Sequence, residues 1–151
     1  MVEEKLKELG LVIPQTPAPL AAYIPAVQTG KFVFTSGQVP ILDGKIKFAG
    51  KVGKDLNEQE GQQAAELCAL NCLSAIKSAA GDLDNIERII KLVVFVNSDE
   101  NFTAQPKVAN GASELMIEIF GEKGKHARSA VGVNQLPMNA AVEIEMIVLL
   151  K

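Results

Sequence analysis

The alternating pattern of residues 141–150 constrains the fold more than any other part of the sequence. One set of alternate positions is wholly apolar: Val142, Ile144, Met146, Val148 and Leu150. The other set mixes carboxylates with aliphatic side chains: Ala141, Glu143, Glu145, Ile147 and Leu149. A period of two predicts a β-strand, and its apolar face should be covered by helices. The mixed face predicts contact with other copies of the chain, although the two glutamates could instead be simply solvated or ion-paired.

Two helices of similar length are predicted between strands. Asn57 and Glu60 have the spacing of a capping box, and this helix should end before Gly81. Pro106 suits the first turn of a second helix, which should end before Gly121. Strands are predicted near residues 24–28, 31–36, 45–48, 87–96, 128–134 and 141–150. This order predicts an α+β two-layer sandwich, with both helices packed on one face of a mixed β-sheet.

The domain organisation is simple. Residues 1–20 read as an N-terminal arm, with a short helix near 2–9 followed by an extended segment that contains three prolines. Residues 21–151 read as a single domain, long enough to form a hydrophobic core. Asp43-Gly44 is a strong turn signal before the expected strand at 45–48.

The bulk composition excludes several classes of function. The formal net charge is −3, and the chain has no tryptophan and one tyrosine, so nucleic-acid binding is not expected as a main role. No apolar run is long enough for a membrane span, and a cytoplasmic location is predicted. Cys68 and Cys72 read as reduced thiols on a helix face, and a metal site would need more ligands.

Arg128 and Glu143 are the leading candidates for chemistry. An arginine offers a planar fork of donors that suits a carboxylate ligand, and a nearby glutamate can position water or move protons. Small residues at 130 and 132 should leave room beside the arginine. A simple hairpin would, however, place Arg128 roughly 20 Å from Glu143 along the strand. Either another strand separates the two, or the site is shared between subunits.

A second candidate is Ser36-Gly37-Gln38 at a strand end. Glycine allows close approach of the backbone to a ligand, and exposed amides can bind an anion. The alternative is an ordinary turn that ends the strand. A serine nucleophile has little support, since the single histidine lies far away in sequence and no aspartate partner is evident.

In these segments the chain resembles the Rid/YjgF family of reactive-intermediate deaminases, also known as L-PSP endoribonucleases or translation inhibitors. The resemblance covers nearly all of residues 20–151. It is carried by Tyr23 with Val27-Gln28, by residues 34–40 and by Val93–Val96 with Phe102, and most strongly by Ala127-Arg128-Ser129, Leu136-Pro137 and residues 142–145.

The resemblance implies a chorismate-mutase-like fold and a homotrimer with three clefts between subunits. It implies that the strand at 87–96 lies between those at 128–134 and 141–150. The implied reaction is hydrolysis of 2-imino or 2-enamino acids to 2-keto acids and ammonia, with no cofactor and no metal. Arg128 would grip the substrate carboxylate, and Glu143 would position or activate water. The implied substrate-binding residues are Tyr23, Ser36, Gly37, Asn110, Ser129 and Ala130.

The chain departs from the family pattern near the arginine. His126 replaces a proline before the Ala-Arg-Ser motif, Ala130 replaces a cysteine, and Ser113 replaces an aromatic residue. The loop 121–126 is slightly longer. These departures indicate a divergent subgroup with the carboxylate clamp kept. Three functions stay open: an imine deaminase, a trimeric binder of small carboxylic acids without turnover, and a ribonuclease, which the acidic composition disfavours.

Overall fold

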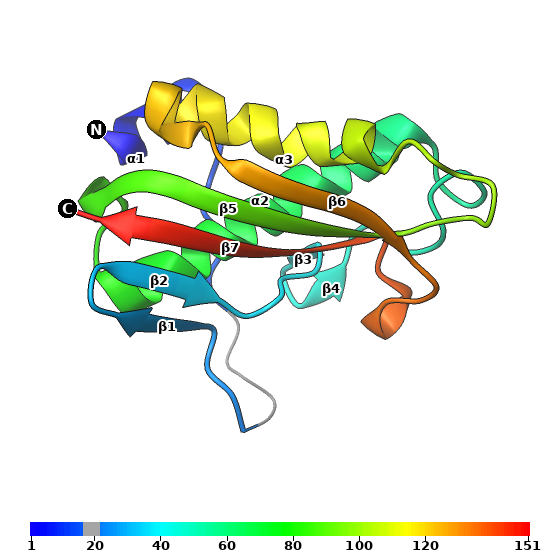
Figure 1. Cartoon of the computed structure of the whole chain (residues 1–151), viewed down its shortest axis with the longest axis horizontal. Coiled ribbons are helices and arrows are strands. Elements are labelled where there is room, and N and C mark those ends of the chain that lie inside the picture. Colours follow the sequence, from blue (N-terminus) through cyan, green and yellow to red (C-terminus); the bar gives the residue numbers. More distant parts are fainter. Residues whose placement is uncertain (17–21) are drawn as a thin grey trace.

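The computed structural model describes residues 1–16 and 22–151 of the 151-residue chain (Figure 1). The strands are β1 (Ala26–Thr29), β2 (Phe32–Thr35), β3 (Ile41–Leu42), β4 (Lys45–Ile46), β5 (Ile86–Asn97), β6 (Ala127–Val133) and β7 (Val142–Leu150). The α-helices are α1 (Val2–Glu8), α2 (Glu58–Ala80) and α3 (Gln105–Phe120). Short 3₁₀ helices span Leu83–Asn85 (η1), Gly121–Gly124 (η2) and Pro137–Asn139 (η3).

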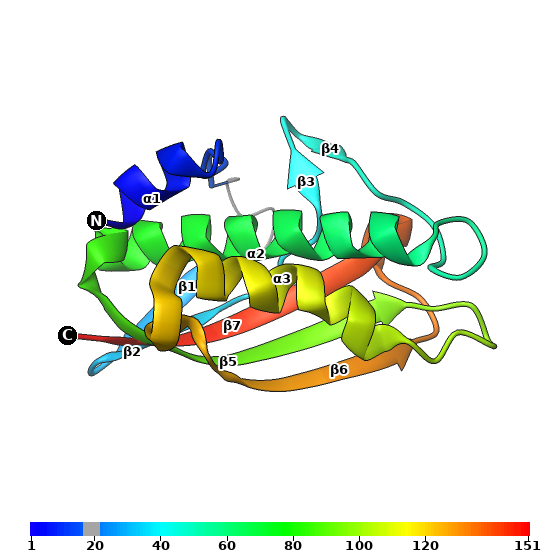
Figure 2. The same cartoon turned by 90° about the horizontal axis from the view of Figure 1, so that it is seen from above.

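The main sheet has five strands in the order β1-β2-β7-β5-β6. β5 and β6 are parallel, and the other neighbours are antiparallel, so the sheet is mixed as predicted. β5 lies between β6 and β7, which explains why the last two strands do not form a hairpin. In Figure 2, α2 and α3 lie side by side over one face of this sheet, and β6 forms one of its edges. The predicted two-layer α+β fold is therefore confirmed.

The ends of both long helices follow the local signals. The Asn57 side chain accepts a hydrogen bond from the backbone of Glu60, whose own side chain accepts from the backbone of Asn57. Gly81 and Gly121 follow the two helices with φ values of 80° and 60°, which suit glycine. The turn at Asp43-Gly44 is also present, but it joins β3 and β4 in a separate two-stranded sheet, and β4 is shorter than expected.

The inner face of β7 and the small residues of α2 form the centre of the core. Val142, Ile144 and Val148 are fully buried, and small α2 side chains allow the helix to lie close to the strand. The Cys68 thiol donates to the carbonyl of Val142 at 3.4 Å, and the Cys72 thiol donates to that of Ile144 at 3.3 Å. Burial raises the pKa of Cys72 to about 12, so both thiols act as neutral donors within the core.

No element of residues 1–16 and 22–151 covers the outer face of the main sheet. Cross-strand neighbours share a face, so Phe32 lies beside Leu149, and Phe34 lies beside Ile147. Phe32, Phe34 and Val131 remain 41%, 42% and 45% exposed. Such a broad apolar surface is typical of an interface.

The N-terminal segment packs on the helical layer. Leu6 of α1 is buried, and the backbone N–H of Val2 donates to Asp84 Oδ1 at 2.7 Å. Further along, Thr16 forms a hydrogen bond with Ser74 on α2. The expected boundary between arm and domain, at residues 20 and 21, and two of the three arm prolines lie outside the described residues.

Within residues 1–16 and 22–151, no helix has the length and apolar character needed to cross a membrane.

Candidate functional site

Arg128 projects from β6 towards α3. In the sheet it lies opposite Leu92, which is fully buried under the helices. Its Nη1 atom donates to Asn110 Oδ1 at 2.9 Å and to Ser113 Oγ at 3.1 Å. Asn110 and Ser113 are three residues apart on α3, so both side chains reach the arginine from one face of that helix. The structure thus brings together Arg128 and Asn110, two of the site residues that the family resemblance implied.

The Arg128 guanidinium has no acidic partner among the described residues. No carboxylate of this part of the chain lies within 4.0 Å of it, and no hydrogen bond engages its Nη2 or Nε atoms. A half-buried guanidinium normally gains a paired carboxylate, because burial without one is costly. The free edge of Arg128 is therefore suited to a carboxylate from outside the chain, held by two parallel hydrogen bonds.

His126 forms a further hydrogen bond with Ser113. Its Nε2 atom lies 2.9 Å from Ser113 Oγ, and its Nδ1 atom lies 2.6 Å from the carbonyl oxygen of Gly124. Because a carbonyl oxygen can only accept, Nδ1 carries the proton and Nε2 accepts from the serine hydroxyl. Burial, and then the charge of Arg128, lower the pKa of His126. We call Arg128, Asn110, Ser113 and His126 the arginine group.

Glu143 lies on the other face of the sheet, next to Gly37. A mutual pair of backbone hydrogen bonds joins Gln38 to Ile144 and holds the segment after β2 against β7. A Cβ atom on Gly37 would lie 2.3 Å from Glu143 Oε1, so only glycine permits this approach. Among the described residues, the backbone N–H of Gly37 has no hydrogen-bond acceptor. A free donor beside a carboxylate is a natural place for a water molecule.

The environment of Glu143 makes it a stronger base than an exposed glutamate. Burial, and then repulsion by the Glu145 carboxylate, raise its pKa. Glu145 is exposed and lies two residues along the same face of β7. A carboxylate that binds a proton more readily than an exposed glutamate suits general-base chemistry.

Ser36 connects Tyr23 to this region. The Ser36 hydroxyl donates to the carbonyl of Ile24 at 2.7 Å, and its backbone N–H donates to Pro25 at 2.8 Å. These bonds fix the segment that carries Tyr23, whose side chain is 56% exposed. We call Glu143, Gly37, Ser36 and Tyr23 the glutamate group.

Two further predicted site residues lie on opposite faces of β6. Ser129 is on the outer face, opposite Val93, which in turn pairs with Glu145. Ala130 faces the helices and packs against the core. Side chains approach Gly132 closely, because a Cβ atom there would meet Gln105 at 2.8 Å and Ser98 at 3.1 Å. With these two residues, Gly132 lines a hollow of about 590 Å³ at the end of β6.

The sequence predicted neither Ser113 nor His126 as a partner of Arg128. Both stood out only as departures from a family pattern. A local signal did exist: alternate residues of extended backbone share a face, so His126, directly before β6, is expected on the same side as Arg128. The three-residue spacing of Asn110 and Ser113 was a second signal. The sequence did not predict how α3 is rotated about its axis, and this rotation turns Asn110 and Ser113 towards β6.

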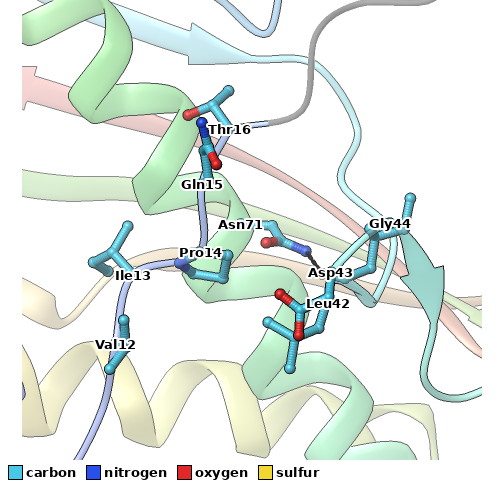
Figure 3. Close-up of a pocket in the computed structure, with 10 residues that line it drawn as sticks. Val12, Ile13, Pro14, Gln15, Thr16, Leu42, Asp43, Gly44 and Asn71 are labelled. Atoms are coloured by element: carbon cyan, nitrogen blue, oxygen red, sulfur yellow. Dashed lines mark hydrogen bonds between the residues drawn. The ribbon is translucent and has the colours of Figure 1, made fainter.

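A separate hollow of about 550 Å³ lies between the arm and the β3–β4 turn (Figure 3). The described residues that line it include Pro14, Leu42 and Asp43, together with Asn71 of α2. The Asn71 side chain donates to the carbonyls of Val39 and Ile41 at 3.0 and 2.9 Å, and so ties this loop to α2. No predicted site residue lines this hollow.

Among residues 1–16 and 22–151, no three His, Cys, Asp or Glu side chains gather as a metal site would require.

Comparisons with known proteins agree with the fold and the resemblance. A family described as “YjgF/chorismate_mutase-like, putative endoribonuclease” matches residues 3–150. Protein TCP17 from Trypanosoma cruzi is 47% identical over 148 residues, covering 97% of this chain and 92% of its own. A 2-iminobutanoate/2-iminopropanoate deaminase from Dermatophagoides farinae is 31% identical over 138 residues, covering 91% and 93%. A crystal structure of a protein of unknown function from Agrobacterium tumefaciens superposes with a TM-score of 0.93 at 46% identity, covering 99% of this chain and 92% of its own.

Proposed function

Because the chain belongs to the YjgF/chorismate-mutase-like family, we propose that it is an enzyme that hydrolyses reactive 2-imino and 2-enamino acids to 2-keto acids and ammonia. The observation that carries the proposal is the Arg128 guanidinium. One of its nitrogens is held by Asn110 and Ser113, while the rest has no partner among the described residues. That arrangement favours a small substrate with a carboxylate.

The proposed site is shared between subunits of a homotrimer. The arginine group and the glutamate group face opposite sides of one sheet, so one chain does not bring them together. β6 is an edge strand, and the outer face next to Glu143 is apolar and uncovered. A neighbouring copy that covers this face with its own β6 edge would bring its Arg128 towards Glu143. A closed ring of three copies repeats this contact three times.

The chemistry requires one water molecule and one group that moves protons. The Gly37 N–H and the Glu143 carboxylate would hold the water, and Glu143 would take a proton as the water oxygen attacks the imine carbon. This step forms a C–O bond and moves the C=N π electrons to nitrogen. Glu143 then returns the proton to the amine, which becomes a leaving group. As the C–N bond breaks, the hydroxyl proton passes back to the Glu143 carboxylate, the C=O bond forms and ammonia leaves.

The reaction makes modest demands on the protein. A protonated imine is already electrophilic, and its hydrolysis changes no oxidation state, so the proposed steps need no cofactor or metal. Arg128 contributes by holding the carboxylate at a fixed position relative to the water. The similarity to a protein named 2-iminobutanoate/2-iminopropanoate deaminase supports this substrate class.

The test is a turnover assay. An amino-acid oxidase generates 2-imino acids in place, semicarbazide traps the surviving imine, and the trapping rate is measured with and without the purified chain. The proposal expects slower trapping and faster release of keto acid, both abolished in Arg128→Ala. If the chain binds 2-keto acids by calorimetry but does not change the trapping rate, it is a binder and not a deaminase. If it cleaves RNA and Arg128→Ala removes the cleavage, the ribonuclease function replaces this one.

A further inference from the structure

We propose that Ser113 and His126 are positioning residues for Arg128, linked to it by a directed chain of hydrogen bonds that ends on the Gly124 carbonyl. The proposal rests on the proposed function only in that Arg128 receives a carboxylate. Nothing in that function requires a histidine or a serine at these positions. The chain of bonds is seen directly in the distances between the side chains.

The donors and acceptors in this series of hydrogen bonds have one consistent assignment. Arg128 Nη1 can only donate, so Ser113 Oγ accepts from it at 3.1 Å. The serine hydroxyl proton is then free for His126 Nε2, 2.9 Å away. His126 Nδ1 donates to the Gly124 carbonyl at 2.6 Å. Every link is satisfied only when the imidazole is neutral and protonated at Nδ1.

Protonation of the imidazole would break this pattern. Both ring nitrogens would then donate, and Ser113 Oγ would face two donors, with its own proton left without an acceptor in the chain. A second positive charge would also stand beside Arg128. Burial and the Arg128 charge both lower the pKa of His126 below its ordinary value of 6.5, although its bond to Gly124 acts in the opposite direction. The neutral form is therefore kept at neutral pH.

Other charged groups lie on the elements that pack near His126, and most are engaged elsewhere. They are Glu87 and Arg88 on β5, Glu122 and Lys123 in η2, Lys125 after η2, and Glu114 on α3. Lys123 pairs with Glu87, and Lys125 pairs with Glu122. Arg88 donates to the Lys125 carbonyl. Glu114 lines a hollow with Glu66 and Glu118. Arg128 is left as the charge that acts on the imidazole.

The series of hydrogen bonds fixes the orientation of the Arg128 guanidinium. Asn110 alone would hold Nη1 at one point, about which the planar group could still tilt. The second bond, to Ser113, removes that freedom, and His126 holds the serine hydroxyl in the orientation that accepts from arginine. The Nε and Nη2 edge then presents a fixed direction to a carboxylate, which lowers the entropy cost of binding.

Binding and titration should be linked in both directions. A carboxylate on Arg128 offsets the positive charge beside His126 and so raises the pKa of the imidazole. Conversely, protonation of His126 should weaken carboxylate binding. Protonation of His126 should therefore raise KM more than it lowers kcat, because the carboxylate contact is made in the ground state and in the transition state alike.

The experiment uses the fact that His126 is the only histidine of the chain. Proton NMR of the full-length protein follows its Cε1–H signal against pH without any need for assignment. We expect a pKa below 6.5 in the native chain, a higher value when pyruvate is added, and higher values in Ser113→Ala and Arg128→Ala. Ser78→Ala is the matched control, because Ser78 is a helical serine of α2 whose hydroxyl donates to the Ala75 carbonyl of its own helix, and it should leave the signal unchanged.

Kinetics supply the second readout. Ser113→Ala and His126→Phe should raise KM for the imino acid by roughly three- to tenfold, with kcat within about twofold. His126→Gln keeps an acceptor for the serine and does not titrate, so it should restore KM and remove the rise of KM in acid. Circular dichroism and light scattering check that each variant folds and assembles.

The two proposals fail in different ways. A native chain without turnover ends the proposed function, while the NMR titration of Ser113→Ala and Arg128→Ala still decides the positioning chain. An unchanged His126 pKa in both variants, or unchanged KM in both Ser113→Ala and His126→Phe, overturns the positioning role whatever the turnover. A variant that fails to fold is replaced by His126→Gln, whose flat KM against pH is then the deciding result.

Discussion

Arg128 and Glu143 project from opposite faces of the same sheet. Arg128 lies opposite Leu92, which pairs with Met146 on the helix-covered side. Glu143 lies opposite Phe95, which pairs with Val131 on the uncovered side. A substrate that touches both side chains must therefore lie between two copies of the chain or round the edge of the sheet. These two arrangements can be distinguished by experiment. Only a site between two copies allows two inactive variants to restore activity when they assemble together.

Complementation between inactive chains is the first prediction. Arg128→Ala and Glu143→Gln, unfolded together in equal amounts and refolded, should regain about a quarter of the native activity. Random mixing gives one site in four an intact arginine from one chain and an intact glutamate from its neighbour. The specific activity of the mixture, compared with each variant refolded alone, is the measurement. Activity no higher than the mean of the separate variants would mean that each site is built from a single chain.

Assembly is the second prediction. The apolar outer face should be covered in solution, so light scattering after gel filtration should give about three times the chain mass of 16.1 kDa. Ile147→Glu places a charge in the centre of that face, next to Phe34, and should yield monomers and lose turnover. Lys7→Glu, an exposed charge change on α1 at the helical layer, is the control. A native mass of one chain would exclude the shared site.

The third prediction concerns the geometry of Arg128. Arg128→Lys keeps the positive charge but replaces the planar fork with a single ammonium, which cannot bond Asn110, Ser113 and a carboxylate in the same way. The loss should be on the order of 1.5–3 kcal/mol in transition-state binding, or roughly ten- to a hundredfold in kcat/KM. Arg128→Ala should lose more, with the trimer retained. Full activity in Arg128→Lys would leave the arginine with a structural role only.

The fourth prediction is an acid limb in kcat set by Glu143. Burial and the Glu145 charge raise the Glu143 pKa, and the base works only when ionised, so kcat should fall with decreasing pH from a point above 4.5. Glu145→Gln removes the repelling charge, lowers the Glu143 pKa and should move this limb to lower pH. Glu143→Gln should lower kcat and abolish the limb. A limb unmoved by Glu145→Gln would assign it to another group.

The contact between Gly37 and Glu143 gives the fifth prediction. In Gly37→Ala the added methyl would lie 2.3 Å from Glu143 Oε1, so the flexible end of the glutamate must move. Stability should change by about 1 kcal/mol or less, because the glutamate can turn aside. Displacement of the base should lower kcat by roughly ten- to a hundredfold. Thermal melting and steady-state kinetics test the two halves. A variant with native kcat would show that the position of Glu143 does not matter.

Local signals in the sequence predicted much of this fold. The alternation in residues 141–150 identified the buried and the open face of β7, and Asn57 with Glu60 marked the start of α2. Each of these signals acts between residues that are near in sequence, where side-chain chemistry and backbone period decide the outcome. The strand order is of another kind. Residues alone allowed β6 and β7 to be neighbours, and only the family resemblance placed β5 between them.

The candidate site was predicted less completely, for the same reason. Arg128 and Glu143 could be identified by residue type, but their faces depend on the register of β5 with both neighbours. Gly37 meets Glu143 because Gln38 bonds to Ile144, a contact between residues more than a hundred positions apart. The partnership of Ser113 with His126 depends on how α3 is rotated over β6. None of these relationships leaves a periodic trace in the sequence.

The reactivity of the two buried thiols would report on motions of β7, the strand that carries Glu143. Cys68 and Cys72 are fully enclosed between α2 and β7, and both thiols are held in the unreactive, protonated form by their raised pKa. A thiol reagent can attack them only while the helix has lifted away from the strand that carries Glu143. The labelling rate under native conditions therefore reports how often α2 and β7 separate. Slower labelling in the presence of pyruvate would show that occupation of the site steadies the strand from its far side.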